Sequence, residues 1–283
     1  MATPDFVVIG HVARDIVPGG WRLGGTAAFA AVQARRLRYA PGVVTRTSPA
    51  VDLPTALPHT QFAGRASITT TCFENVYADG ERTQRVPEQA EWLSMEDVPA
   101  AWRAVPIVLV GGLCGEVPPN TAFEMRKSET IGVSAQGWLR EVDPETKAVR
   151  KRTWHREPFW RGAGAVFASE EDLEPEPAQA EVWAAETPIV AITRAGYGAR
   201  VAIEARWQAI DAYPADQLDP TGAGDVFATA FLIRYHETRD PAEATRFAAA
   251  AASCSVEGTG IERIASRAEI EERMREHPEI ALR

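Results

Sequence analysis

The chain is poor in the features that mark disulfide-stabilised, metal-binding and membrane proteins. Cysteine occurs only at positions 72, 114 and 254, and no Cys-x-x-Cys pair is present, so neither a zinc ribbon nor a redox pair is predicted. The five histidines are scattered, and none lies four residues from another. The sequence has no apolar run of about 18 residues, and its first residues lack the basic and apolar segments of a signal peptide. We therefore expect a cytoplasmic protein without a membrane span.

An excess of positive charge is also missing. The 283 residues carry a formal net charge of −9, and 45% of them are hydrophobic. A protein that binds nucleic acid or an anionic membrane is more often basic, so we expect neither partner. The composition is that of a globular protein, and the length suits one large α/β domain or two smaller ones.

Short apolar runs alternate with amphipathic segments along most of the chain. This alternation predicts an α/β fold with a mainly parallel sheet and helices on both of its faces. The expected strands lie at 6–10, 107–111, 131–134, 165–168 and 188–193, with a hairpin at 201–210, and the expected helices lie at 24–37, 121–127, 225–236, 241–256 and 267–276.

Residues 61–92 differ in character from the rest. The segment 67–76 is rich in β-branched residues, Asp79-Gly80 is typical of a hairpin turn, and 83–86 fits a return strand. We interpret this region as a small antiparallel sheet that is inserted into the α/β chain and covers a pocket as a lid.

The most informative segment is LDPTGAGDVF at 218–227, which an apolar helical pattern follows. A loop of small residues thus leads directly into a helix, where free backbone N–H groups carry partial positive charge. Glycines let this backbone approach a ligand closely, and a phosphate is its natural occupant. Asp225 lies beside these groups. It is either an ordinary helix-capping carboxylate or a base that takes a proton from a hydroxyl while the N–H groups stabilise a transferring phosphoryl group.

The stretch DPTGAGDVF resembles the C-terminal signature of the ribokinase-like (PfkB-type) carbohydrate kinases. Further resemblances follow in the family's order: Gly24-Gly25 before an Ala-rich helix, the acidic stretch 169–172 after a strand, and the turn at 193–198. Together they span about residues 6–275. The resemblance implies a single kinase domain over 1–283, folded as a three-layer sandwich with a mainly parallel sheet and a small antiparallel lid formed by about 12–23 and 61–92.

The resemblance also implies roles for individual residues in a transfer from ATP. Asp225 would be the catalytic base, and the anion hole would be formed by Gly222, Ala223 and Gly224. The nucleotide would be held by Thr193, Gly198, Thr221, Gly258 and Gly260. The acceptor would be held by Asp15, Gly24, Gly25 and Phe29. Mg²⁺ would be held, through water, by Asp172 or Glu171, and Asp219 would contact a monovalent cation such as K⁺.

Within the family, the chain resembles the myo-inositol kinase branch, because Phe29 stands where many sugar kinases carry an acceptor-binding Asn. A small polyol or sugar, myo-inositol first, is the expected acceptor. A nucleoside kinase of the same fold is a second interpretation, and it would need Phe29, Phe73 or Trp138 as a platform for a base. A catalytically silent nucleotide- or sugar-binding regulator is a third, and an unrelated α/β fold in which the loop merely caps a helix is a fourth. The lid sheet is a candidate homodimer surface.

Overall fold

A nine-stranded sheet forms the centre of the computed structural model, which describes residues 3–78 and 81–283. Its strands are β1 (Phe6–Ile9), β4 (Pro41–Val44), β5 (Gln61–Ala63), β8 (Ile107–Gly111), β9 (Thr130–Ser134), β12 (Ala165–Ser169), β13 (Ile189–Thr193), β14 (Ala199–Ile203) and β15 (Arg206–Ile210). The order is β15-β14-β13-β12-β9-β8-β1-β4-β5. Neighbours are parallel except for the terminal β13–β14 and β14–β15 pairs. The predicted mainly parallel α/β sheet is confirmed.

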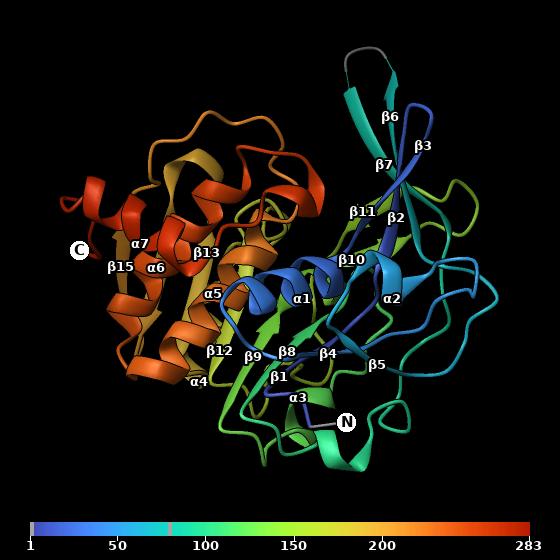
Figure 1. Ribbon diagram of the computed structural model, residues 1–283, viewed down its shortest axis with the longest axis horizontal. Helices are drawn as coiled ribbons and strands as arrows, with labels where there is room; N and C mark the ends of the chain where they lie inside the picture. The colour runs from blue at the N-terminus through green and yellow to red at the C-terminus, as the bar shows by residue number, and fades with distance from the viewer. Residues whose placement is uncertain (1–2, 79–80) are drawn as a thin grey trace.

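Helices cover both faces of this sheet (Figure 1). They are α1 (Thr26–Arg36), α2 (Leu53–Ala56), α3 (Thr121–Glu124), α4 (Gln179–Glu186), α5 (Ala223–Thr238), α6 (Pro241–Ser255) and α7 (Arg267–Glu276). Side chains alternate along β1 as strand geometry requires. Phe6 and Val8 belong to the core beneath α1, α5 and α6, whereas Val7 and Ile9 belong to a second core that includes Trp183 of α4. The molecule therefore has the three layers expected of a doubly covered sheet.

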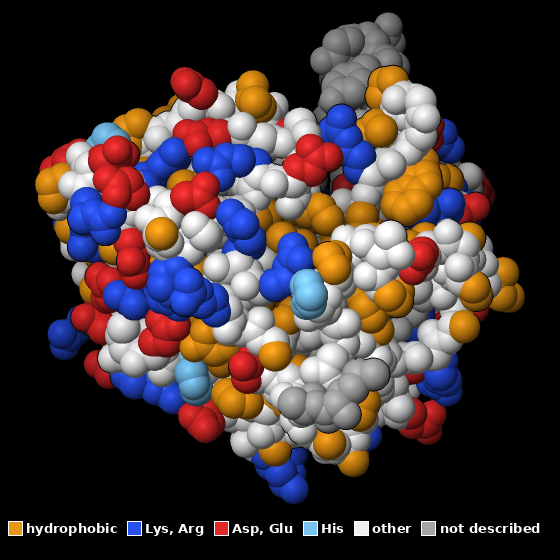
Figure 2. Space-filling view, viewed as in Figure 1, with side chains coloured by type: hydrophobic (Ala, Val, Ile, Leu, Met, Phe, Trp, Pro, Cys, Tyr) orange, Lys and Arg blue, Asp and Glu red, His pale blue; other side chains and the backbone are white. Residues whose placement is uncertain are grey.

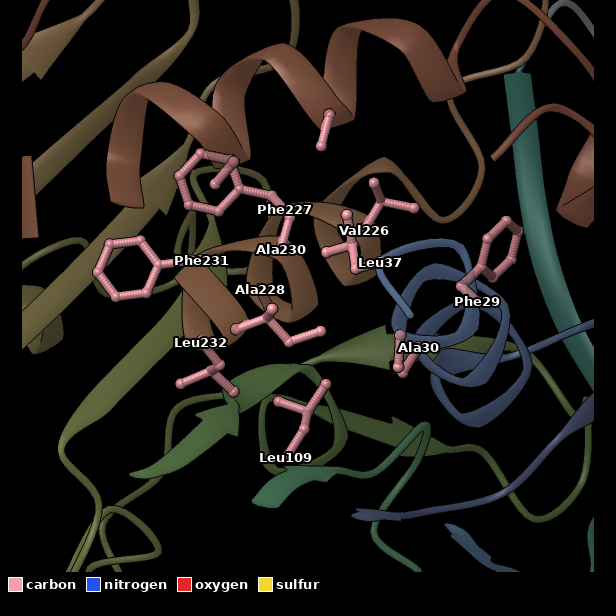
Figure 3. Packing of buried hydrophobic residues seen from close by; sticks show 14 of the residues in the cluster. Phe29, Ala30, Leu37, Leu109, Val226, Phe227, Ala228, Ala230, Phe231 and Leu232 are labelled. Atoms are coloured by element: carbon pink, nitrogen blue, oxygen red, sulfur yellow. The ribbon is translucent and has the colours of Figure 1, made fainter. Parts of the chain in front are cut away.

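Helix α5 is the central support of the first core. It packs most extensively against α6 and also contacts α1, β8, β9 and β12. Its side chains from Val226 to Ile233 are all buried, and Phe227 and Phe231 both contact Phe167 of β12 edge to face. Figure 3 shows Phe227 and Phe231 between the helices and the sheet. This packing holds the first turn of α5, and hence the loop before it, at a fixed height above the sheet.

A second sheet stands at one side of the large one and forms the lid (Figure 1). Its order is β3-β2-β6-β7, with β2 at Ala13–Val17, β3 at Gly20–Gly24, β6 at Cys72–Ala78 and β7 at Glu81–Glu88. The small antiparallel lid that the sequence predicts over about 12–23 and 61–92 is present, with two antiparallel hairpins joined by a parallel β2–β6 pair. One bound differs, because residues 61–63 pair with β4 in the large sheet. The expected turn at Asp79-Gly80 lies outside the described residues.

One hairpin has no counterpart among the predicted elements. Strands β10 (Arg140–Val142) and β11 (Val149–Lys151) pair with each other as a separate two-stranded sheet. They follow the short 3₁₀ turn η2 (Ala135–Trp138) at the end of β9. The tip of the hairpin reaches the lid, because the Val86 amide of β7 donates to the Lys147 carbonyl at 2.8 Å.

Within the part of the chain that the structure describes, no helix has the length and apolar character needed to cross a bilayer.

Candidate active site

The glycine loop turns sharply into α5. Gly222 is the residue before the helix and adopts φ 79° and ψ −1°, a left-handed conformation that glycine tolerates best. A Cβ at this position would lie 2.2 Å from the ring of Phe29. Asp219 closes the other side of the turn, since its Oδ1 accepts a hydrogen bond from the Thr221 amide at 2.9 Å. The loop is thus fixed both by its own backbone and by the buried aromatic ring below it.

The first turn of α5 offers backbone N–H groups to a ligand, as the sequence predicts, but the set differs from the expected one. The Ala223 amide donates to the Pro220 carbonyl at 3.2 Å. Among the described residues, the amides of Gly222, Gly224 and Asp225 have no hydrogen-bond acceptor. Such free amides at a helix N-terminus bind anions. Of the three residues in the predicted anion hole, Gly222 and Gly224 thus have free amides, whereas the Ala223 amide is bonded within the turn.

The Asp225 carboxyl group lies in the first turn of α5 and lines the cavity next to this loop. Its pKa is raised from 3.8 to about 6, mainly by burial, and the charges of Asp172 and Asp15 contribute to this rise. The hydroxyl of Thr26 and the guanidinium of Arg140 act in the opposite direction. A carboxyl group with a pKa near 6 is ionised at neutral pH and is a much better proton acceptor than an ordinary aspartate.

The loop opens on a cavity of about 590 Å³ at the carboxyl ends of the parallel strands. Ser134, Ser169 and Thr193 are the last residues of β9, β12 and β13, and all three line it. This edge is where open α/β sheets bind ligands. Several small or apolar side chains also line the cavity: Tyr213, Pro214, Ala215, Ala249, Ala252, Ser253 and Val256. The predicted nucleotide residues Thr193 and Gly198 also line the cavity.

The predicted metal residues Asp172 and Glu171 both line this cavity, but their surroundings differ. Asp172 is 3% exposed; its Oδ1 accepts from Arg140 Nε at 2.8 Å and its Oδ2 from Ser169 Oγ at 2.7 Å. Glu171 is 70% exposed and has Lys151 Nζ 3.3 Å away. No cluster of three or more potential metal ligands is found in the described chain. Mg²⁺ prefers carboxylate oxygens and usually keeps several of its waters, so these two carboxyl groups stay the predicted residues for holding it through water.

The predicted acceptor residues lie on the lid side of Asp225. Asp15 of β2 is close enough to Asp225 for the two charges to interact, and burial followed by the charge of Asp219 raises its own pKa to about 6. Gly24 makes room for it, since a Cβ there would lie 2.0 Å from Asp15 Oδ2. Gly25 adopts φ 81° at the start of α1, against the backbone of His11 and Ala13.

Several predicted contact residues do not reach the cavity. Phe29 is 1% exposed, so it supports Gly222 from below instead of facing an acceptor. Thr221, Gly258 and Gly260 are not among the residues that line the cavity. Gly258 packs against Arg263, and the Gly260 amide donates to Asp219 Oδ2 at 3.3 Å. Of these residues, Phe29 and Gly260 contact the glycine loop from outside it, and Asp219 as a monovalent-cation ligand stays a prediction.

Arg140 lines the cavity from β10 and is not among the predicted site residues. No local pattern indicated it, because the residue stands in a polar stretch with no predicted element. A basic residue shortly after a predicted parallel strand would have been the available signal, since strand ends gather at the ligand edge.

Comparisons with known proteins agree with this geometry. The model of the pfkB family of carbohydrate kinases matches residues 67–266. An inositol 3-kinase from Oryza sativa subsp. japonica is 27% identical over 249 residues, which are 80% of this chain and 61% of the relative, so the chain spans about three fifths of that protein's length. A pyrophosphate-dependent kinase in the ribokinase family, complexed with a pyrophosphate analog and myo-inositol, superposes with a TM-score of 0.78 at 22% identity and with 95% and 99% of the two chains covered. The Arabidopsis thaliana ribokinase complexed with ribose and ATP superposes with a TM-score of 0.74 at 19% identity. The match covers 96% of this chain and 99% of the ribokinase. These structures share the ribokinase-like fold with this chain.

Proposed function

The chain belongs to the pfkB family of carbohydrate kinases, and from this premise we propose that it transfers the γ-phosphoryl group of ATP to a hydroxyl of a small polyol, with myo-inositol as the first candidate. The observation that carries the proposal is the placement of Asp225. Its carboxyl group, with a pKa raised to about 6, lies at the same helix start as the free amides that would receive a phosphate. A base beside an anion hole is the arrangement that phosphoryl transfer to an alcohol requires.

Each group then has one part in the transfer. Asp225 takes the proton of the acceptor hydroxyl, whose oxygen forms a bond to the γ-phosphorus. The amides of Gly222, Gly224 and Asp225 stabilise the charge on the transferring group. Asp15 accepts hydrogen bonds from the acceptor's other hydroxyls. Mg²⁺, held through water by Glu171 and Asp172, would neutralise phosphate charge.

ATP is favoured as the donor by the shape and lining of the cavity. The small and apolar side chains that line it, among them Tyr213, Ala249 and Val256, offer a surface on which an adenine packs, and the cavity volume of about 590 Å³ exceeds what a pyrophosphate alone fills. Pyrophosphate is nevertheless a donor to test, because kinases that use it are among the similar structures.

The nucleoside kinase alternative loses support. Its base would need an open aromatic face, and the three candidates are buried: Phe29 is 1% exposed, Phe73 6% and Trp138 2%. Trp138 is moreover stacked on Phe159 with 4.6 Å between the ring centroids.

The lid remains a candidate dimer surface, since Ile16 and Trp21 are each 42% exposed and hydrophobic side chains gather over β2 and β3 in Figure 2. Dimerisation stays a prediction.

A panel of donors and acceptors tests the proposed function. We expect phosphorylated product, detected by mass spectrometry, with Mg·ATP and myo-inositol or another polyol, and little or none with adenosine or cytidine. Ribose and fructose test the sugars, and Mg·pyrophosphate tests the second donor. An absence of product from every polyol and sugar, while ATP still binds, would contradict the proposal and favour the silent regulator.

The acceptor assignment predicts a specific defect when Gly24 is replaced by alanine. The new Cβ would displace the Asp15 carboxylate, which lies 2.0 Å from its position. Loss of one hydrogen bond to a charged group costs about 1.5 kcal/mol, so we expect the KM for the acceptor to rise about tenfold with the KM for ATP unchanged. The matched control is Gly20→Ala in the same strand, where a Cβ would have no atom within 4 Å and both KM values should stay the same. An unchanged acceptor KM in the Gly24 variant would remove Asp15 from the acceptor site.

A further inference from the structure

The base of the β10–β11 hairpin is fastened to the acidic segment that follows β12. Arg140 and Lys151 are paired across the hairpin, and both make ion pairs with this segment. Arg140 Nε contacts Asp172 Oδ1 at 2.8 Å, and Lys151 Nζ contacts Glu174 Oε2 at 2.7 Å and Glu171 Oε1 at 3.3 Å. The two cations thus hold the hairpin against the cavity edge.

Arg140 is held in one orientation. A guanidinium group is planar and carries five N–H donors in a fixed fork, so the bond from Nε to Asp172 also fixes its two terminal nitrogens. Nη1 lies 3.5 Å from the amide oxygen of Gln84 on lid strand β7. The side chain is 17% exposed and lines the cavity. Donors that are not used by Asp172 therefore remain at the cavity wall.

The far end of the hairpin is fixed as well. Val86 of β7 donates from its amide to Lys147 O at 2.8 Å, and Arg85 Nε donates to Thr146 O at 2.9 Å. The hairpin is consequently clamped at its base by the acidic segment and at its tip by the lid. Such support from both ends is what a precisely placed charged group needs.

The charges of the side chains that line the cavity indicate a role for the Arg140 guanidinium. Among the described residues that line it, Arg140 is the only one with a cationic side chain, whereas Glu171, Asp172 and Asp225 all carry carboxyl groups. A polyphosphate adds further negative charge. The guanidinium is also close enough to Asp225 to lower its pKa, which places it near the base and the glycine loop.

We propose that Arg140 is a catalytic residue that donates hydrogen bonds from its terminal nitrogens to the γ-phosphoryl group of the donor, and that Asp172 is the positioning residue that holds it there. This inference rests on the proposed phosphoryl transfer. In that step the acceptor oxygen bonds to the γ-phosphorus, the bond from this phosphorus to the β–γ bridging oxygen breaks, and its electron pair leaves on ADP. The hydroxyl proton passes to Asp225. Arg140 stays protonated throughout and stabilises the charge on the transferring group.

The test compares Arg140→Met and Arg140→Lys with a matched control, Arg150→Met. Arg150 is on the same hairpin and pairs with Asp143 at 2.6 Å, but it is 62% exposed and does not line the cavity. Steady-state kinetics are measured for each variant, and calorimetry gives the affinity for Mg·ADP and for the non-hydrolysable ATP analogue AMP-PNP with Mg²⁺. AMP-PNP carries a γ-phosphate and ADP does not, so a contact to that group appears as a difference between the two.

We expect Arg140→Met to lower kcat about 10²- to 10³-fold, as the loss of one charge-stabilising donor does. The affinity for AMP-PNP should fall about tenfold or more, the value of one hydrogen bond to a charged group, while the ADP affinity stays nearly constant. Arg140→Lys, which keeps the charge and a partner for Asp172, should recover part of kcat, and it serves as the binding probe if the Met variant does not fold. Arg150→Met should match the wild type.

Three results would overturn the inference. Equal losses of affinity for AMP-PNP and ADP would place Arg140 at the β-phosphate or assign it a structural role. A rise in the acceptor KM alone would place it at the acceptor. An unchanged kcat in Arg140→Met would remove it from the reaction. If the wild type turns over no acceptor, the proposed function fails, but the comparison of AMP-PNP with ADP still decides whether Arg140 contacts the γ-phosphoryl group. If the wild type binds neither nucleotide, both the proposed function and the role of Arg140 fail.

Discussion

Replacing Asp225 by asparagine is expected to lower kcat about 10³-fold, the contribution typical of a positioned general base, with the KM for ATP nearly unchanged. The carboxyl group lies in the first turn of α5 beside the amides of Gly222 and Gly224, and it lines the cavity. Asparagine has almost the same shape and keeps the packing, but it does not accept a proton. Steady-state rates with the best acceptor from the panel measure the effect. A loss of less than about tenfold would leave Asp225 without a catalytic role.

The same variant separates the base from a simple helix-stabilising residue, because the two predict opposite changes in stability. The pKa of Asp225 is raised from 3.8 to about 6 in the folded state, so between these values the native protein binds more protons than the unfolded chain, and stability falls as the pH rises through this window. At neutral pH the ionised carboxylate of Asp225 therefore destabilises the folded state. Asparagine should raise the free energy of unfolding by about 1 kcal/mol, a value discounted for partial exposure. A residue that only stabilised the helix dipole would instead lose about 0.5 kcal/mol.

The pH dependence of kcat/KM follows from the same shift. Activity should rise with pH and level off above about 6, where Asp225 is ionised. Asp15 titrates near the same value, so the acid limb should be steeper than one proton requires. The charges that face Asp225 are those of Arg140, Asp172 and Asp15. A profile that rises toward acidic pH would exclude a carboxylate base.

The sequence predicts the glycine loop and its helix well because their geometry is local. The order of small residues from 219 to 225, followed by an apolar helical pattern, specifies a turn and a helix start, and α5 begins at Ala223, two residues before the predicted start at 225. The parallel sheet is predicted for a similar reason, since buried strands are short apolar runs between turns.

What the sequence could not predict depends on contacts between distant segments. Arg140 reaches the cavity only because the β10–β11 hairpin is clamped between the lid and the segment after β12, and no local pattern encodes that. The family resemblance places Phe29 at the acceptor, but in helix α1 its buried ring lies against Gly222. The Ala223 amide could not be separated from its neighbours, because its bond to the Pro220 carbonyl follows from the exact turn.

The glycine loop itself allows stability and phosphate binding to be separated by two alanine substitutions two residues apart. Gly222 has φ +79°, and a Cβ there would overlap the buried ring of Phe29 at 2.2 to 2.4 Å. Gly224 has no such φ, a Cβ there would have no protein atom within 4 Å, and the residue lines the cavity. The first position is therefore restricted by the protein, whereas the second has open space that the donor would occupy.

Gly222→Ala is expected to lower the free energy of unfolding by about 2 to 4 kcal/mol, from left-handed strain and overpacking together, and kcat should fall because the loop shifts. Gly224→Ala should be as stable as the wild type or more so, because alanine favours the helix by about 1 kcal/mol over glycine. Its Cβ would nevertheless enter the space of the phosphate, so the affinity for Mg·AMP-PNP should fall about tenfold or more. Thermal unfolding and calorimetry on both variants measure the two effects. If Gly224→Ala binds AMP-PNP as tightly as the wild type, the phosphate does not dock on this helix start, and the transfer geometry proposed for Asp225 is wrong.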